Sequence, residues 1–271
     1  MQDCPLLRCS KCFGAFYCGQ DCQKEDWPTH KAICKKAQYT IALWETKAGR
    51  SITVAEHDAM NKRDILLAGI GLPESQFNRG VALENGIGVP VNKVQAFTFY
   101  KKAADQGCAE AQHNVGLAYK FGNGVTIDLK ASLSWFKKSA EQGFALSQFN
   151  VGCFYAEGIV GSVDIVKAVS WWRKSAEAGL AEGQHCLAGA YASGKGVPLD
   201  RAQSIKWYRK ACQQGYVESQ FRLGLTFVFG GTPLEKIEAV QWLEIAAVAG
   251  HNLAKERIED LRDTLTPLLQ N

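Results

Sequence analysis

The sequence predicts a mainly α-helical protein, in which an α-solenoid made of helical hairpins follows a small cysteine-rich finger. Two observations support this fold class. Glutamine and glycine recur at an interval of 36 residues, at Gln76, Gln112, Gln148, Gln184 and Gln220 and at Gly107, Gly143, Gly179 and Gly215. Six of the ten cysteines fall within the first 34 residues. A fixed period of this length indicates a repeat array, in which each repeat buries its apolar face against its neighbours.

One repeat, residues 111–143, has the pattern of two helices joined by a turn. Val115 and Tyr119 follow a helical spacing, and Gly122 ends that pattern. Asp128 is then placed to cap a second helix, because an aspartate side chain can accept hydrogen bonds from the first backbone amides of a helix. Each repeat is therefore expected to be a helical hairpin.

Two further positions recur for reasons of packing. Small residues stand where two helix backbones must approach closely, at Ala96, Ser132, Ala168, Ser204 and Ala239. Tryptophan recurs in the second helix, at Trp135, Trp171 and Trp207 and, one residue late, at Trp242. We expect these four tryptophans to lie in the core of the array.

The repeat pattern, A-x-x-x-LG-x-x-Y-x-x-G-x-GV…D…KA…WY-x-KAAE-x-G, resembles the Sel1-like repeat, a relative of the tetratricopeptide repeat. The resemblance covers five repeats over residues 74–251. Two repeats depart from the pattern, at residues 159–161 and 231–233, where the usual second glycine of the turn is displaced or lost. We expect these two turns to differ in shape from the others.

The N-terminal cysteines have the spacing of metal ligands. The candidate ligands form three pairs: Cys9 and Cys12, Cys18 and Cys22, and His30 and Cys34. A C-x2-C pair directs two sulfurs at one ion, and thiolates with imidazole are the usual ligands of structural zinc. A chance cluster of structural cysteines is the weaker interpretation, because so short a segment has almost no apolar core to hold it folded without metal.

In its details, YC-x3-CQ-x3-W-x2-HK-x2-C, this segment resembles the MYND zinc finger over nearly all of residues 4–34. The resemblance implies two interleaved zinc sites. The first is complete, with Cys9, Cys12, His30 and Cys34 as its ligands. The second would take Cys18, Cys22 and Cys4, and Met1 stands where its fourth ligand belongs. Either Asp3 or water completes the second site, or the native start lies upstream of Met1, or the finger binds one zinc ion.

The MYND resemblance also implies a groove for a proline-rich peptide, formed by Ser10, Gln23 and Trp27. Gln23 and Trp27 are four residues apart and therefore share one face of a helix. The indole offers proline rings a flat apolar platform, and Ser10 and Gln23 can hydrogen-bond the peptide backbone. In the alternative interpretation, Trp27 closes the finger's own small core.

We expect four segments along the chain. They are the finger at 1–37, a linker with an N-terminal capping helix at 38–73, the five repeats at 74–251 and a C-terminal capping helix at 252–271. The N-terminal capping helix is expected over 54–71, where apolar residues follow helical spacing. Terminal helices with a polar outer face protect the apolar ends of a repeat array.

The first helix of each repeat lines the inner curve of the array if the tetratricopeptide pattern holds. Its aromatic position then forms a candidate partner-binding stripe of Phe77, His113, Phe149, His185 and Phe221. Four residues flank this stripe: Leu117, Lys120, Phe121 and Leu225. In the alternative interpretation, the same rings pack between neighbouring helices.

Both resemblances imply a non-catalytic zinc-binding adaptor or scaffold for protein–protein interactions, not an enzyme. MYND fingers also occur in lysine methyltransferases, but the 36 residues between finger and repeats leave no room for that catalytic domain. A weak hydrolase is an alternative, because Sel1-like proteins have been linked to β-lactam hydrolysis, yet no nucleophile here has an evident base partner. DNA-associated regulation through the finger is a third hypothesis, weakened by a net charge of only +4.

The composition also bears on location. No apolar run approaches the ~20 residues of a membrane span, and the N-terminal residues lack the apolar core of a signal peptide. Four cysteines outside the finger share no repeating pair and are expected to be free thiols: Cys108, Cys153, Cys186 and Cys212. We therefore expect a cytoplasmic or nuclear protein with protein or peptide partners, no membrane contact, no small-molecule substrate and no nucleic acid.

Overall fold

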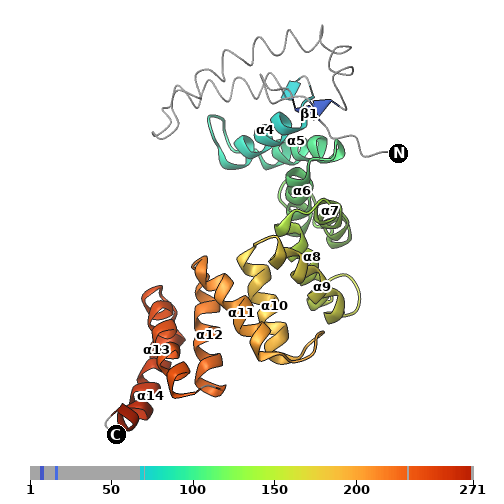
Figure 1. The fold of residues 1–271 in the computed structure, drawn as a ribbon. Helices are drawn as coiled ribbons and strands as arrows, with labels where there is room; N and C mark the ends of the chain where they lie inside the picture. The colour runs from blue at the N-terminus through green and yellow to red at the C-terminus, as the bar shows by residue number, and fades with distance from the viewer. Residues whose placement is uncertain (1–6, 9–15, 18–67, 70, 231, 270–271) are drawn as a thin grey trace. The chain divides into compact units, whose positions relative to one another are not determined.

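The computed structural model describes residues 7–8, 16–17, 68–69, 71–230 and 232–269 (Figure 1). The chain divides into two compact units, residues 1–128 and 129–271. The first unit contains the strands β1 (Leu7–Arg8) and β2 (Phe16–Tyr17) and the helices α4 (Pro73–Asn85), α5 (Lys93–Asp105) and α6 (Ala109–Phe121). The second contains α7 (Leu129–Glu141), α8 (Ala145–Glu157), α9 (Ile165–Glu177), α10 (Ala181–Ser193), α11 (Arg201–Gln213), α12 (Val217–Gly230), α13 (Pro233–Val248) and α14 (Asn252–Leu269). The predicted mainly α fold of helical hairpins is confirmed.

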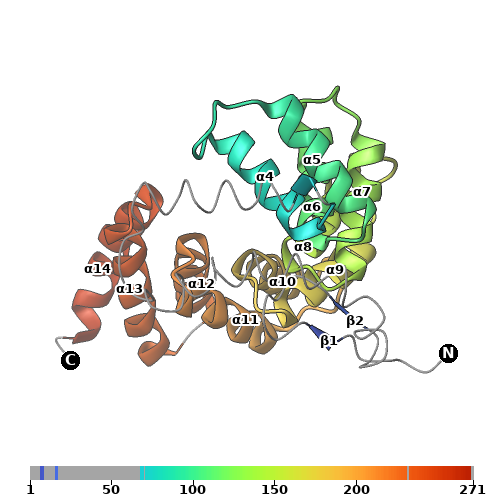
Figure 2. The same ribbon diagram turned by 90° about the horizontal axis from the view of Figure 1, so that it is seen from above.

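Helices that follow one another in the sequence pack against each other within each unit. In the first unit α5 contacts both α4 and α6, and in the second unit the contacts run without a break from α7 to α14. The first helix of one repeat also touches the first helix of the next, since α8 contacts α10. Figures 1 and 2 show the succession from α8 to α14 in two perpendicular views. None of the described helices combines the length and the hydropathy that a membrane span requires.

The helix ends follow the sequence signals. The first helix of each of the first four repeats ends at a glycine in the left-handed region: Gly86, Gly122, Gly158 and Gly194, with φ of 74°, 74°, 63° and 67°. The second helix begins after a capping side chain in three repeats, where Asn92, Asp164 and Asp200 accept hydrogen bonds from backbone amides three residues later. In the remaining one of these four repeats the second helix begins at Leu129, directly after Asp128.

Two turns differ from the others, as predicted. In the third repeat the second glycine is Gly161, with φ of 125°, whereas Gly124 and Gly196 have φ of 75° and 74°. In the fifth repeat α12 runs one residue longer than the earlier first helices, and α13 starts at Pro233 behind a capping box formed by Thr232 and Glu235. In the sequence, the position of the usual second glycine is taken by Val160 in the third repeat, where the glycine is displaced to Gly161, and by Thr232 in the fifth.

The core corrects one sequence-based prediction. Trp207 is buried, but Trp135, Trp171 and Trp242 are only partly buried. In the second repeat the fully enclosed ring is that of the next residue, Phe136. Three of the tryptophan rings instead lie beneath lysine side chains in cation–π contacts. The distances from the lysine amino group to the ring centroid are 4.1 Å for Lys138 and Trp135, 4.1 Å for Lys174 and Trp171, and 4.3 Å for Lys210 and Trp207. A long lysine stem covers an apolar ring while its charge stays in water, so these positions need only partial burial.

The recurring glutamine connects one repeat to the next. The side-chain amides of Gln112, Gln148 and Gln184 donate to the carbonyl oxygens of Ala104, Ala140 and Ala176, at 3.1, 3.2 and 3.3 Å. Each acceptor lies in the last turn of the preceding helix, where carbonyls have no partner within the helix. Each of these carbonyls also accepts from the amide of the glycine three residues later, so the glutamine adds a second hydrogen bond at the helix end, across the interface between consecutive helices.

The C-terminal helix is present as α14. Its buried residues are Ala254, Ile258 and Leu261, while the charged residues Lys255, Glu256, Arg257 and Glu259 are exposed. This is the polar outer face that a terminal helix requires. Of the helix expected over 54–71, only Ala68 and Gly69 are described as helical, and Ala68 is buried.

Candidate functional site

The described part of the finger is a pair of antiparallel strands. Leu7 pairs with Tyr17 and Arg8 with Phe16, so β1 and β2 form a short ladder. In the sequence Cys9 follows β1 directly, Cys18 follows β2 directly, and Cys12 lies in the segment that joins the strands. A hairpin that carries a C-x2-C pair in its connection fits a structural zinc site, because both thiolates come from one short segment.

The remaining predicted finger residues lie outside the described residues. This applies to all candidate zinc ligands, Cys4, Cys9, Cys12, Cys18, Cys22, His30 and Cys34, and to the candidate peptide groove of Ser10, Gln23 and Trp27. The donor set of three cysteines and one histidine in the first site is a standard tetrahedral set for zinc. Within the described residues there is no group of three or more His, Cys, Asp or Glu side chains placed to hold a metal ion.

The stripe predicted on the first helices is closely packed against neighbouring rings. Phe221 is 5% exposed and stacks on His251 with ring centroids 4.1 Å apart. The ring of His185 contacts the rings of Tyr208 and Tyr216, with centroid distances of 5.6 and 5.2 Å. These contacts agree with the alternative interpretation, in which the rings of the stripe pack between neighbouring helices.

The other predicted stripe residues are buried or partly buried. His113 is 7% exposed, Phe77 and Phe149 are partly buried, and the ring of Phe77 lies 5.8 Å from that of Tyr100. Of the flanking residues, Leu117 and Lys120 are partly buried and Phe121 is 60% exposed, with the Lys120 amino group 5.3 Å from its ring. The accessible surface of the first helices therefore lies beside the stripe.

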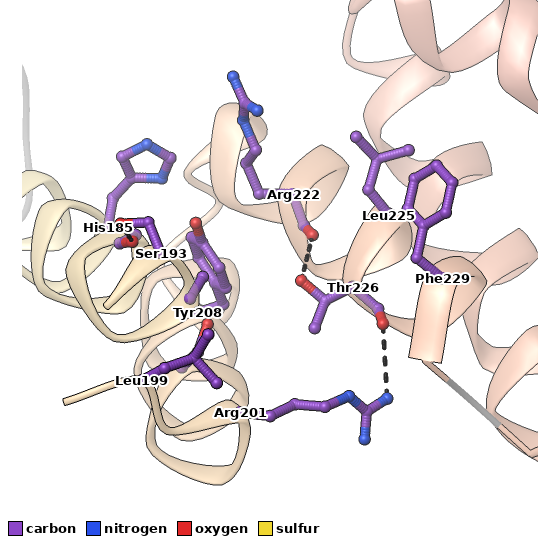
Figure 3. A pocket seen from close by; sticks show the side chains of 12 residues that line it. His185, Ser193, Leu199, Arg201, Tyr208, Arg222, Leu225, Thr226 and Phe229 are labelled. Atoms are coloured by element: carbon purple, nitrogen blue, oxygen red, sulfur yellow. Dashed lines mark hydrogen bonds between the residues drawn. The ribbon is translucent and has the colours of Figure 1, made fainter. Parts of the chain in front are cut away.

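An open cavity of about 610 Å³ lies between α10, α11 and α12 in the second unit (Figure 3). Figure 3 shows His185, Ser193 and Tyr208 on one side of it, facing Leu225, Thr226 and Phe229 on the other. The cavity thus contains one stripe residue, His185, and one residue beside the stripe, Leu225. We call this cavity the α10–α12 pocket.

Gly189 opens the α10–α12 pocket. At 36-residue intervals its position is occupied by Val81, Leu117, Cys153 and Leu225, so only this repeat has no side chain there. A Cβ placed on Gly189 would have a single neighbour within 4 Å, the Tyr208 hydroxyl oxygen at 3.5 Å. The glycine at position 189, where the other four repeats have a larger side chain, is the feature of the sequence that could have located the pocket.

The polar groups of the α10–α12 pocket are mostly donors. Arg201 donates from Nη1 to Glu235 at 3.2 Å and from Nη2 to the Thr226 carbonyl at 3.4 Å, while its buried Nε has no partner among the described residues. Ser204 is fully buried, and its Oγ likewise has no described partner. Arg222 donates from Nε to Glu218 at 2.9 Å. Arg201 and Arg222 therefore bring guanidinium N–H donors to the lining, whereas Nε of Arg201 and Oγ of Ser204 are enclosed by the protein.

The hydroxyl groups near the α10–α12 pocket are not arranged for nucleophilic attack. Ser193 and Thr226 donate to the carbonyls of Gly189 and Arg222 in their own helices, at 2.8 Å each. Nδ1 of His185 hydrogen-bonds Oγ of Ser219 at 2.8 Å, but Ser219 is completely buried. Burial also lowers the pKa of His185. A serine and histidine pair thus exists here without access to a substrate.

Comparison with known proteins identifies both parts of the chain. The Sel1 repeat pattern matches residues 73–108, 109–144, 145–180, 181–216 and 217–251, which is more than half of the chain. The chain belongs to the Sel1 repeat family. A MYND finger matches residues 3–34, ahead of the repeats. The predicted order of a MYND-type finger followed by five Sel1-like repeats is confirmed, and the finger implies zinc binding.

Two solved structures resemble the Sel1 repeats of this chain. The protein c5321, described as a protective antigen of uropathogenic Escherichia coli strains displaying an SLR fold, is 31% identical with a TM-score of 0.70, over 77% of this chain and 48% of that one. A Sel1 repeat protein from Oxalobacter formigenes is 32% identical with a TM-score of 0.67, over 73% of this chain and 58% of that one. These similarities support the repeat fold over most of the chain.

Curated relatives match a much shorter stretch. Tudor domain-containing protein 1 of Homo sapiens is 36% identical over 58 residues, which is 21% of this chain and 5% of that protein. The N-lysine methyltransferase SMYD2 of Homo sapiens is 59% identical over 29 residues, which is 11% of this chain and 7% of that enzyme. The chain thus spans only a small fraction of the length of these relatives, and the similarity to the methyltransferase is confined to the finger.

Proposed function

We propose that this Sel1 repeat protein is a non-catalytic, zinc-dependent adaptor, whose finger takes a proline-rich peptide and whose repeats hold a second protein. The observation that carries the proposal is the α10–α12 pocket, an open cavity with apolar walls and hydrogen-bond donors but without an accessible activated nucleophile. Such a surface suits binding. The MYND finger gives the same chain a second recognition element.

The thiols of the repeats support a non-catalytic role. Burial raises the pKa of Cys186 and Cys212 to about 12 and that of Cys108 to about 11. A thiol becomes nucleophilic as the thiolate, so these groups are inert at neutral pH. Neither these three cysteines nor Cys153 form a disulfide among the described residues, which favours the reducing environment of the cytoplasm or nucleus.

The finger contribution rests on three residues. Gln23 and Trp27 are four residues apart in the sequence, a spacing that would place both on one face of a helix, and Ser10 belongs to the C-x2-C segment that joins β1 and β2. An extended proline-rich peptide has unpaired backbone carbonyls and flat rings, which match two hydrogen-bonding side chains and one indole. Zinc holds this groove in shape, because a segment of this size has little core of its own.

The test uses the full chain loaded with zinc. Calorimetric titration with a synthetic P-x-L-x-P peptide is expected to show binding that Trp27→Ala abolishes, with zinc content unchanged. Trp44→Ala, which removes an indole outside the finger, serves as the matched control and should bind as the original chain does. Retained binding in Trp27→Ala would refute the groove, and joint loss of zinc and peptide would place Trp27 in the finger core instead.

A second assay addresses catalysis. The full chain is incubated with a panel of ester and β-lactam substrates, and hydrolysis is followed against a buffer blank. No turnover above the blank is expected, because Ser219 is buried beside its histidine. Turnover that Ser219→Ala removes would refute the non-catalytic proposal.

A further inference from the structure

We infer that the exposed face of α13 binds a second copy of this chain, so that two α13 helices pair antiparallel about a two-fold axis. Five residues make up this face, which we call the α13 face: Leu234, Ile237, Gln241, Ile245 and Val248. The inference goes beyond the proposed function and does not depend on it, because it concerns self-association and not the binding of a peptide or of another protein.

The α13 face is exposed to solvent although most of it is apolar. Val248 is 90% exposed and Leu234 is 77% exposed, while Ile245 and Ile237 are 46% and 44% exposed. Gln241, in the middle, is exposed as well. The five residues follow one another at intervals of three or four within a single helix, so they share one side of it. At about 1.5 Å per residue, this side of the helix is about 21 Å long.

The opposite side of α13 makes the contacts that hold the last repeat together. Ala239, Leu243 and Ala246 are fully buried, and α13 packs against α12 and α14. Leu243 and Ala246 belong to the apolar cluster that also contains Ile258 of α14. The α13 face is therefore not needed for packing within the chain, and an exposed row of large apolar side chains is typical of an interaction surface.

Two residues of the α13 face differ in kind from those of every other repeat. With the one-residue slip of the last repeat, Ile245 is equivalent to a lysine in each of the other four: Lys102, Lys138, Lys174 and Lys210. Val248 is equivalent to an acidic residue or glutamine in all four: Asp105, Glu141, Glu177 and Gln213. The repeat fold thus accepts polar and charged side chains at both positions. It does not require isoleucine or valine there, so binding is the better explanation for them.

The spacing within the α13 face favours a second copy of the chain as the occupant, because it is symmetric about Gln241. Ile237 and Ile245 lie four residues before and after Gln241, and Leu234 and Val248 lie seven before and after. When two such helices pair antiparallel with Gln241 at the centre, Ile237 comes level with Ile245 of the second copy, and Leu234 with Val248. The two glutamines meet at the axis, where each side-chain amide offers the other a donor and an acceptor. An interface with two-fold symmetry requires this self-complementarity.

The charges beside the α13 face are compatible with this pairing. Glu238 and Glu244 lie three residues before and after Gln241, on opposite edges of the face. In an antiparallel two-fold pair each edge of one helix faces the same edge of the other, so Glu238 does not face Glu244 of the second copy. Glu238 also accepts hydrogen bonds within its own chain, from Arg209 at 2.8 Å and from the indole N–H of Trp242 at 3.1 Å. Helices that lie on a membrane surface instead carry lysine and arginine beside their apolar residues.

The association is expected to be weak, because one helix face is a small interface. A stable interface buries about 800 Å² per partner, more than five side chains along about 21 Å of helix provide. Sedimentation velocity of the zinc-loaded full chain from about 1 µM to about 500 µM covers the range of such a weak dimer. The sedimentation coefficient should rise with concentration from the value of a monomer to that of a dimer. A constant monomer value over this range would overturn the inference.

Ile245→Lys tests whether the dimer uses the α13 face. It introduces the residue that the other four repeats carry, so the urea midpoint should stay near that of the original chain. The dissociation constant of the dimer should rise by about tenfold or more, because two ammonium groups enter an apolar contact. Val166→Lys is the matched control, since it removes an exposed apolar residue from α9 where the second repeat has Lys130, and it should dimerise as the original chain does. Dimerisation that Ile245→Lys leaves unchanged would overturn the assignment to α13.

A paired substitution tests the antiparallel register. Ile237→Glu alone should weaken the dimer, as Ile245→Lys does. In a chain with both changes, the new carboxylate comes level with the new ammonium group of the second copy, so the dimer should bind about threefold or more tighter than either single variant. A double variant no tighter than the single ones would overturn the antiparallel pairing. Binding of a monomeric chain to phosphatidylcholine vesicles, lost in Ile245→Lys, would assign the face to a membrane surface and overturn the inference.

Discussion

Gln214 donates a hydrogen bond from its side-chain amide to Oε1 of Gln184 at 2.9 Å. The same bond joins Gln106 to Gln76 in the first repeat, at 2.8 Å. In the third repeat the corresponding acceptor, Oε1 of Gln148, is buried without a partner among the described residues. The sequence explains the difference, because alanine replaces glutamine 30 residues later, at position 178.

Ala178→Gln is therefore expected to stabilise the array. Ala178 has φ of −72° and ψ of −2°, close to the −91° and 5° of Gln214, so the backbone already suits the new side chain. A hydrogen bond to a buried, unsatisfied acceptor should raise the free energy of unfolding by about 0.5–1.5 kcal/mol. The measurement is a urea titration followed by circular dichroism, with the midpoint expected to rise at constant slope.

Ala178→Glu is the control for the new bond. A glutamate has nearly the same size as glutamine but, when ionised, no donor for the Gln148 oxygen. It should give no gain in stability at neutral pH. Equal gains in the two variants would show that the stabilisation comes from apolar contacts of the side-chain stem and not from the hydrogen bond.

The partial burial of the tryptophans leads to a second prediction. Phe136 is fully enclosed and its ring lies 5.8 Å from that of Phe154 in an edge-to-face arrangement. Phe136→Ala should lower the free energy of unfolding by about 3–5 kcal/mol through loss of apolar contacts and the cavity left behind. Trp135→Ala should cost less, because that ring is partly exposed and covered by Lys138. Thermal unfolding of both variants checks the order.

The sequence predicted the hairpins well because their signals are local. Glycine ends a helix wherever the backbone needs a positive φ, as at Gly122, and aspartate caps the next helix, as at Asp164. The choice between Trp135 and Phe136 for the core could not be made in the same way. Both are large aromatic residues on adjacent positions, and the direction of the neighbouring helices decides which one is enclosed.

The candidate pocket was harder to predict than the fold. It needs three helices from two repeats, and its main cause is the absence of a side chain at Gly189. The sequence predicted a partner-binding role for the aromatic residues of the stripe, yet Phe221 is packed against His251. A missing side chain is a weak signal in one sequence, because glycine within a helix has several possible causes.

A third prediction concerns acid stability. His113 is 7% exposed, and burial lowers its pKa to about 4, below the usual value of 6.5. The unfolded chain therefore binds a proton between pH 6.5 and pH 4 while the folded chain does not, so stability falls as the pH falls through this range. The expected loss from this residue is about 2 kcal/mol between pH 7 and pH 5. Urea titrations at the two pH values measure it.

His113→Phe is the matched variant for this pH effect. Phenylalanine occupies the equivalent positions Phe77, Phe149 and Phe221, so the repeat accommodates it. The variant should lose about 2 kcal/mol less than the original chain between pH 7 and pH 5. An unchanged pH dependence would mean that His113 is not the group that takes up the proton on unfolding.

The fourth prediction tests the complete zinc site. Structural zinc contributes about 10–16 kcal/mol of apparent binding free energy, far more than the core of a segment below about 40 residues provides. Cys9→Ser or Cys34→Ser should therefore unfold the finger and leave the helices of the repeats intact. Heteronuclear NMR spectra of the full chain should show loss of dispersion for finger signals only. Preserved finger signals, in either variant or after chelation, would refute the ligand assignment.

The last prediction concerns the number of zinc ions. Cys18 and Cys22 need further ligands for a second site, and the sequence offers Cys4, with Asp3 or water as a fourth ligand. If that site forms, elemental analysis of the full chain should give two zinc ions, and Cys4→Ser should reduce the count to one while the complete site persists. A smaller loss of finger stability is expected for Cys4→Ser than for Cys9→Ser, because the complete site of Cys9, Cys12, His30 and Cys34 persists in Cys4→Ser. A count of one in both the original chain and Cys4→Ser would show that the finger holds a single zinc ion through Cys9, Cys12, His30 and Cys34.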